Sequence, residues 1–165
     1  MENVIFVSTG EVKVCDINNH LKSTAIGSCV VVTAWDSFQK IGGMAHVMLP
    51  GAAPKGKKEY ATKYASNAID KLLGQLSQLG TKKENLKVYL IGGADVLKRE
   101  NDTIGEDNLR SIQKCLGLKG LLIDAMAVGD TSRRSAFLNV SSGFVYYTEG
   151  DSDERLLSST TELSI

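Results

Sequence analysis

The sequence carries no excess of charge of either sign. Lysine plus arginine and aspartate plus glutamate each number 19, so the formal net charge is zero at pH 7. Proteins that attract nucleic acid or anionic membranes through their overall charge are basic, and we therefore expect neither partner. No apolar run is long enough to span a bilayer, and the amino-terminal residues lack the basic start and cleavage site of a secretory signal. We expect a cytoplasmic protein without membrane insertion.

Cysteine is scarce, with three residues in the chain, Cys15, Cys29 and Cys115. An odd number at wide spacing argues against a disulfide framework. The absence of any Cys-x-x-Cys pair argues against a structural zinc site, and we expect no metal, nucleotide or other cofactor. Each thiol therefore needs its own explanation, as a core residue, a redox sensor or a nucleophile.

Proline is rarer still, and both prolines fall within residues 50–58, together with two glycines and three lysines. This composition is typical of a flexible, solvated loop. After the loop, apolar residues at three- and four-residue spacing predict an amphipathic helix over residues 59–79. Before it, runs rich in β-branched residues predict four strands, at residues 3–8, 11–17, 29–35 and 41–49.

The second half of the chain continues both patterns. It predicts a strand that runs into a glycine turn at 86–95, a helix at 105–117, a strand at 121–128 and a closing hairpin at 133–149. The whole predicts one α+β domain over residues 1–150, with layered mixed or antiparallel β-sheets flanked by helices. Residues 151–165 are predicted to be a polar tail, although the short "RLL" within it could dock.

Several residues outside the main patterns have ordinary structural interpretations. His20 falls at a predicted turn, and Arg133 and Arg134 are predicted to start a strand in solvent. Cys115 lies on the apolar side of the second helix, where a small core residue is expected. The glycines of "IGGAD" are not followed by Lys-Ser or Lys-Thr, so they predict a tight turn or close backbone packing instead of a phosphate loop.

The strongest chemical signal joins Cys29 to His46, one of only two histidines. If the two central strands form a hairpin in which Asp36 faces Ile41, Cys29 lies opposite Met48. Because side chains alternate between the faces of a strand, His46 then shares the face of Cys29. The two lie on a diagonal, with Cα atoms about 7–8 Å apart. A slip of one residue in the register would place them on opposite faces.

A cysteine and a histidine at this distance are a candidate catalytic pair. The imidazole can accept the thiol proton and later protonate a leaving amine. A third polar group usually orients the imidazole, and Ser23 and Thr24 offer two hydroxyls shortly before Cys29. The backbone N–H groups at Gly27, Ser28 and Cys29 are candidates for an oxyanion hole. The alternative is that the cysteine is a buried core residue without a chemical role, and that the histidine is a hydrogen-bonded structural residue.

The combined motifs are similar to those of the CheD family, the chemoreceptor glutamine deamidases of chemotaxis. "GSCVVVTAWD" followed by "IGGMAHVMLPG" resembles the family signature, and "KYASNAIDKLL", "IGGAD", "TIGEDN" and "FLNVSSGFVYY" follow in the family's order. The resemblance implies an enzyme that hydrolyses selected glutamine side chains on chemoreceptor helices to glutamate. It also implies a fold similar to that of cysteine-dependent deamidating toxins.

The resemblance further assigns roles to individual residues. It implies Cys29 as the nucleophile, His46 as the base, and a threonine shortly before the cysteine as the third member. Thr24 fits by residue type, and Ser23 stays open as the alternative. A CheC-type phosphatase is implied as a partner. An alternative function is therefore a non-enzymatic regulator that binds CheC through the same surface.

Overall fold

Two mixed β-sheets and two longer helices make up the structure, a computed structural model that describes residues 3–157. The first sheet has the order β1 (Asn3–Phe6), β3 (Asn19–Ile26), β8 (Arg134–Asn139), β9 (Val145–Glu149) and β10 (Arg155–Leu157). The second has the order β2 (Val12–Cys15), β5 (Ile41–Val47), β4 (Val30–Asp36), β6 (Leu86–Gly92) and β7 (Ala125–Val128). The helices are α1 (Ala65–Gln78) and α2 (Ile104–Leu118), with 3-10 turns η1 (Lys58–Lys63) and η2 (Lys83–Asn85).

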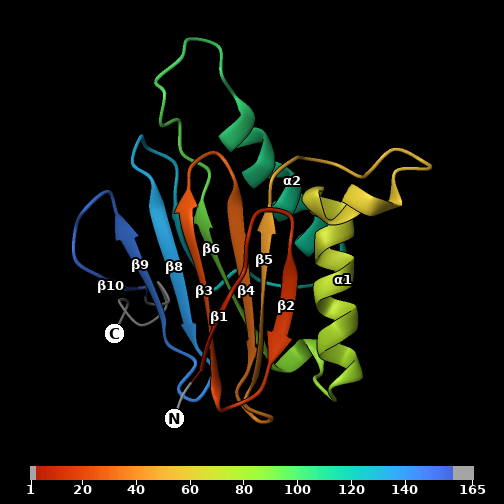
Figure 1. The fold of residues 1–165 in the computed structure, drawn as a ribbon. Coiled ribbons are helices and arrows are strands. Elements are labelled where there is room, and N and C mark those ends of the chain that lie inside the picture. The colour runs from red at the N-terminus through yellow and green to blue at the C-terminus, as the bar shows by residue number, and fades with distance from the viewer. Residues whose placement is uncertain (1–2, 158–165) are drawn as a thin grey trace.

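The elements stack in three layers, sheet on sheet and then helices (Figure 1). One apolar core lies between the sheets, and a second lies between the second sheet and the helices. β4 stands at the centre of the second sheet and is buried along its whole length, which explains its continuous apolar sequence. The predicted α+β fold of layered sheets flanked by helices is confirmed.

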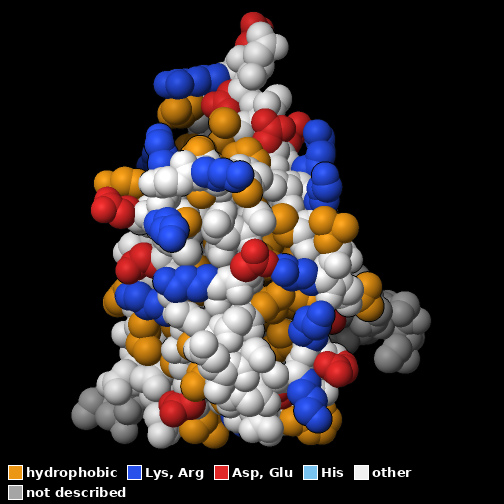
Figure 2. Space-filling model, turned by 90° about the vertical axis from the view of Figure 1, so that its right-hand side faces the viewer, with side chains coloured by type: hydrophobic (Ala, Val, Ile, Leu, Met, Phe, Trp, Pro, Cys, Tyr) orange, Lys and Arg blue, Asp and Glu red, His pale blue; other side chains and the backbone are white. Residues whose placement is uncertain are grey.

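The helical layer presents a polar outer side. α1 buries one stripe of residues against the second sheet, made of Ala65, Ala68, Ile69, Leu72 and Leu76. Figure 2 looks onto this layer and shows lysine, arginine and acidic side chains interspersed over it. The predicted amphipathic helix is therefore present, but it begins at Ala65, because an extended residue, Tyr64, separates it from η1.

β3 is absent from the strands predicted above, and the predicted turn at His20 is wrong. β3 pairs with β1 on one side and β8 on the other, and His20 lies within it, 4% exposed. Its ring packs on Phe137, with 5.2 Å between the ring centroids. The strand has few β-branched residues, so pairing with its two neighbouring strands, and not its own composition, holds it extended.

In the carboxyl-terminal third, the expectation about Arg134 needs correction. Arg134 was expected in solvent but is 3% exposed, because its guanidinium donates to the Gly129 carbonyl at 2.8 Å and lies 3.7 Å from the Glu149 carboxylate. Arg133 is exposed as predicted. Within the predicted polar tail, the short "RLL" docks, as the sequence allowed, because Arg155–Leu157 form β10 and pair with β9. Residues 158–165 lie outside the described part.

Trp35 joins the two sheets at the end opposite the β3–β4 connection. Its indole N–H donates to the Val140 carbonyl at 2.7 Å, which links β4 to the end of β8. Gly143, in the loop between β8 and β9, packs directly on the indole. A Cβ built there would lie 2.4 Å from the ring atoms Cε3 and Cζ3. The loop can close over the indole only if residue 143 has no side chain.

We expect Gly143→Ala to lower the free energy of unfolding by about 1–3 kcal/mol more than Gly129→Ala does. The two glycines have nearly equal φ, +80° and +82°, so both variants share the strain of a left-handed alanine. Only Gly143 has a neighbour that a Cβ would meet, since nothing described lies within 4 Å at Gly129. Urea unfolding of both variants measures the difference, and equal losses would contradict the packing argument.

Candidate active site

The β4–β5 hairpin has the register that the sequence predicts. Asp36 pairs with Ile41, and the ladder runs without interruption to Val31 opposite His46 and Val30 opposite Val47. Cys29 lies in the bend directly before β4. It therefore comes two residues before Val31 on the same face, the face that packs against the first sheet. The expected diagonal between Cys29 and His46, with Cα atoms about 7–8 Å apart, follows from this register.

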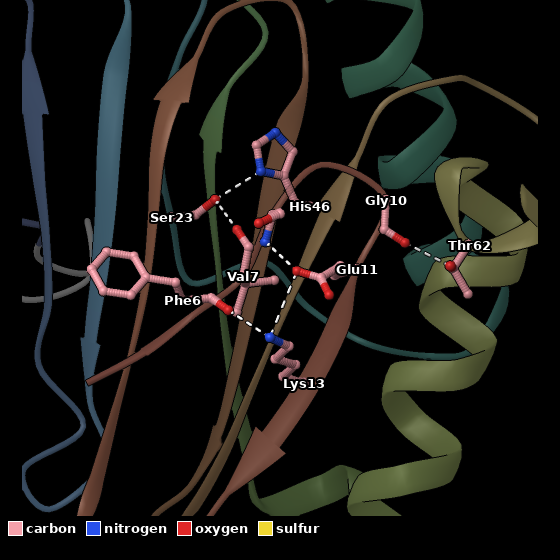
Figure 3. Close-up of polar contacts among 9 residues, drawn as sticks. Phe6, Val7, Gly10, Glu11, Lys13, Ser23, His46 and Thr62 are labelled. Atoms are coloured by element: carbon pink, nitrogen blue, oxygen red, sulfur yellow. Dashed lines mark hydrogen bonds and ion pairs between the residues drawn. The ribbon is translucent and has the colours of Figure 1, made fainter. Parts of the chain in front are cut away.

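The His46 side chain is held in one orientation. It is 2% exposed, and its Nδ1 lies 2.7 Å from the Ser23 hydroxyl oxygen (Figure 3). The same hydroxyl donates to the Val7 carbonyl at 2.7 Å. Its backbone is fixed as well, because its N–H donates to the Glu11 carbonyl and its carbonyl accepts from Gly10.

This hydrogen-bond chain determines which ring nitrogen carries the proton. The Val7 carbonyl can only accept, so the single Ser23 hydroxyl proton goes to it. The contact between Ser23 and His46 then requires that Nδ1 is the donor. In the neutral ring this leaves Nε2 with its lone pair. Within residues 3–157, Nε2 is buried and has no hydrogen-bond partner, so it is available as a base.

Of the two hydroxyl residues considered for the third position, the structure brings Ser23 to the histidine. Ser23 is 1% exposed, whereas Thr24 is exposed at the surface. Ser23 follows the buried Leu21 by two residues and pairs in register with Ala136, so the ordinary alternation of a strand turns Ser23 inward and Thr24 outward. The irregularity in the pairing with β8, where Ala25 has φ of +54°, begins only after Ser23. Ser23 therefore points inward to His46.

The bend that carries Cys29 is held in place by hydrogen bonds to its carbonyl groups. The Gly27 carbonyl accepts from the Ala94 N–H at 3.0 Å, and the Cys29 carbonyl accepts from the Gly93 N–H at 2.8 Å. The turn after β6 can approach so closely because it contains glycine: a Cβ on Gly92 would lie 2.3 Å from the Cys29 carbonyl oxygen. The prediction of close backbone packing for "IGGAD" is confirmed.

Asn108 is a site residue that the sequence reasoning missed. It lies on α2, is completely buried, and donates from Nδ2 to the Ser28 carbonyl at 2.9 Å and to the Met48 carbonyl at 3.0 Å. A signal was present in the sequence, because Asn108 precedes Ile112 and Leu116 at four-residue spacing. An amide on the buried stripe of a helix needs polar partners from another element.

The electrostatics of the pair favour uncharged groups at rest. Burial raises the pKa of the Cys29 thiol above its ordinary value, and an interaction with its own backbone N–H opposes the change. Burial also lowers the pKa of His46, which the nearby Val7 carbonyl only partly offsets. Both shifts disfavour ions, so a neutral thiol and a neutral imidazole are favoured at rest. The other thiols have raised pKa values from burial as well, with Cys15 at about 12.

Comparison with known proteins places these features in a family. The family model described as "CheD chemotactic sensory transduction" matches residues 48–149. The chain belongs to the CheD family. A CheD relative from Chlorobium luteolum, named a probable chemoreceptor glutamine deamidase, is 37% identical over 93% of this chain and 76% of its own length. The chemoreceptor glutamine deamidases CheD of Halalkalibacterium halodurans and Thermotoga maritima are 34% and 33% identical, over 84% and 83% of this chain and 89% and 86% of their own.

The matched region of the CheD model contains the turn after β6 and α2, which bond to the bend at Cys29, and also the β8–β9 hairpin. Cys29, His46 and Ser23 precede it, and their arrangement stands on the geometry described above. The solved structure of Bacillus licheniformis hypothetical protein YfiH is a weaker match, with a TM-score of 0.46 and 11% identity over 74% of this chain and 50% of that one.

Among residues 3–157, no three histidine, cysteine or acidic side chains come together in a way that could hold a metal ion. No helix in the same range combines the length and apolar character needed to cross a membrane.

We expect the protein to lose stability as the pH falls below about 6.5, and His46 to account for part of the loss. The pKa of His46 is lowered in the fold, so the unfolded chain binds a proton at a pH where the folded protein does not. Folding therefore becomes less favourable from the ordinary pKa of 6.5 down to the lowered one. His46→Asn keeps a side-chain N–H near Ser23 but does not titrate. Urea unfolding at several pH values should show a smaller acid loss for His46→Asn, and equal losses would contradict the buried neutral histidine.

Proposed function

We propose that the protein hydrolyses glutamine side chains on chemoreceptors, with Cys29 as the nucleophile and His46 as the base. The observation that carries the proposal is the orientation of His46: its Nδ1 proton is committed to Ser23, and its Nε2 lone pair is on the face shared with Cys29. The names of the relatives support the substrate, since those proteins are chemoreceptor glutamine deamidases.

In the first step, Nε2 of His46 accepts the proton of the Cys29 thiol as the sulfur attacks the carbonyl carbon of the glutamine amide. Because the resting pair is uncharged, proton transfer accompanies the attack instead of preceding it. The new carbon–sulfur bond produces an oxyanion. Collapse of this intermediate breaks the carbon–nitrogen bond, and the proton held by His46 leaves with the nitrogen as ammonia. The product of the step is a thioester on Cys29.

In the second step, water displaces the Cys29 sulfur from the thioester. Nε2 of His46, again neutral, accepts a proton from the water as the oxygen attacks the thioester carbon. The carbon–sulfur bond breaks, the sulfur recovers the proton from His46, and glutamate leaves. Each cycle consumes one water and releases one ammonia, so the residues in the fold balance the reaction without a cofactor.

Ser23 is the third member of the proposed site, in place of Thr24. It touches the imidazole and not the substrate, so it is a positioning residue that fixes the tautomer. Gly27 and Ser28 contribute the backbone of the bend, whose N–H groups are proposed to bind the oxyanion.

The proposed substrate approaches at the end of the molecule that carries Cys29. The β3–β4 bend, the start of α2 and the loop after β5 all lie at this end (Figure 1). Cys29 itself is only partly buried. The loop over residues 50–58 carries Lys55, Lys57 and Lys58 in exposed positions, and we propose that it flanks the bound receptor helix.

We expect Cys29→Ala to abolish deamidation and His46→Asn to lower kcat/KM by about 10²- to 10⁴-fold. The assay incubates purified protein with the cytoplasmic domain of a receptor in ¹⁸O-labelled water and locates converted glutamines by mass spectrometry. Hydrolysis places one solvent oxygen in each glutamate formed. Cys115→Ala is the matched control, because that thiol lies on α2 and has no role in the proposed reaction. Undiminished conversion by Cys29→Ala would rule out the proposed mechanism.

Ser23 and Thr24 are neighbours that provide a matched pair of variants. Ser23→Ala removes the group that fixes the histidine tautomer, and we expect kcat/KM to fall about 10- to 100-fold. Thr24→Ala truncates an exposed hydroxyl, so its kcat/KM should stay within about twofold, as is usual for surface substitutions. The receptor assay measures both. A larger loss in Thr24→Ala than in Ser23→Ala would reverse the assignment.

Binding to a CheC-type phosphatase stays a prediction from the family resemblance. The rate of Cys29 alkylation by iodoacetamide distinguishes a catalytic thiol from one kept only within a binding surface. A catalytic Cys29 should react faster than Cys15 and Cys115 in the native protein, because the register puts Cys29 on the diagonal from His46. Equal rates, together with retained CheC binding, would favour the non-enzymatic role.

A further inference from the structure

Asn108 makes a connection that the reaction steps above do not use. Its Nδ2 donates to the carbonyls of Ser28 and Met48, at 2.9 and 3.0 Å. Carbonyl oxygens only accept, so the amide nitrogen, and not Oδ1, must face both of them. One buried side chain on α2 thus joins the residue before Cys29 to the residue two positions after His46.

The bond to Ser28 fixes the peptide unit between Ser28 and Cys29. In a planar trans peptide the N–H points opposite to the C=O, and no cis peptide occurs among the residues described. Since Asn108 holds the Ser28 carbonyl toward α2, the N–H of Cys29 points away from α2. Ala94 holds the Gly27 carbonyl in the same manner and so orients the N–H of Ser28.

The N–H of Cys29 is free for a ligand and lies next to the thiol. Ser28 and Cys29 stand outside the strands, and no backbone bond found in residues 3–157 has either N–H as its donor. A fixed, unused donor beside a nucleophile has the properties that an oxyanion requires.

We propose that Asn108 is a positioning residue for deamidation, which aims the Cys29 N–H at the oxyanion formed when the sulfur attacks the substrate. The inference rests on the proposed function. A purely structural role explains the side chain less well, because Oδ1 is buried and lacks a hydrogen-bond partner in the described chain. An unsatisfied buried acceptor lowers the stability of the fold. The presence of asparagine at this position is therefore better explained by the two carbonyl groups to which its Nδ2 donates.

The test compares Asn108→Leu with wild type in two assays. Leucine has a similar size and removes both donors without adding charge. We expect kcat for receptor deamidation to fall about 10- to 100-fold, with KM nearly unchanged, because the oxyanion exists only during reaction. Alkylation of Cys29 by iodoacetamide should stay within about twofold, since that reaction forms no oxyanion. Asn108→Ser, which keeps one donor, should show an intermediate kcat.

Ser111→Ala is the matched control. Ser111 lies one turn further along α2 and accepts a hydrogen bond from the Gly51 N–H at 2.8 Å, so this variant also breaks a bond between the helix and a loop. It leaves the Ser28–Cys29 peptide untouched, and its kcat should match that of wild type. An unchanged kcat in folded Asn108→Leu would overturn the inference. So would a parallel fall in kcat and alkylation rate, which would indicate general disruption of the site.

A measurement on the wild-type chain applies if neither Asn108 variant folds. The amide proton resonance of Cys29 is followed by NMR while the thiol forms a hemithioacetal with an aldehyde analogue of the glutamine side chain. Its downfield shift should exceed that of the iodoacetamide-alkylated protein, which has no oxyanion, and equal shifts would overturn the inference. If wild type leaves receptor glutamines unchanged, the proposed function fails instead, and the NMR comparison still tests the direction of the N–H.

Discussion

The pairing of β4 with β5 is the constraint on which the candidate site depends. β4 has partners on both edges and apolar layers on both faces, so its register is fixed by burial as well as by hydrogen bonds. A shift of one residue would move Val30 and Val32 from the helical side to the other sheet and move His46 away from Ser23. The cost of that exchange keeps Cys29 and His46 on the same face. The geometry that the proposed catalysis needs is in this way maintained by the packing of residues that take no part in it.

The site also depends on the contact between the two sheets. His46 belongs to the second sheet, whereas Ser23 belongs to the first and Val7 follows β1 of the first. The imidazole is therefore oriented only when the sheets are packed together. Each hydrogen bond of this kind contributes about 0.5–1.5 kcal/mol net, a small share of the stability from two apolar cores. Its importance lies in selecting one tautomer of His46, which apolar packing alone does not do.

The sequence was most informative where structure is local. The β-branched run after Cys29 and the short turn before Ile41 were enough to predict the hairpin and, through alternation, the shared face of Cys29 and His46. It was less informative where long-range contacts decide. The direction of Ser23 follows from the alternation of β3, but most residues of that strand are polar, and its pairing partner β8 lies more than a hundred residues later. The burial of Arg134 and the bridging bonds of Asn108 likewise require partners from distant segments, which no periodicity reveals.

The hydrogen-bond chain behind His46 ends on the carbonyl of Val7, which is an atom of the main chain. Catalytic histidines are often backed by a carboxylate, which can be protonated in acid and can be replaced by mutation. A peptide carbonyl carries no titratable proton, and every amino acid provides one. Side-chain substitution at position 7 therefore alters the last acceptor only by moving the backbone. The last acceptor of this hydrogen-bond series is therefore present whenever the chain adopts this fold. Ser23 and His46 are the members that a substitution can remove.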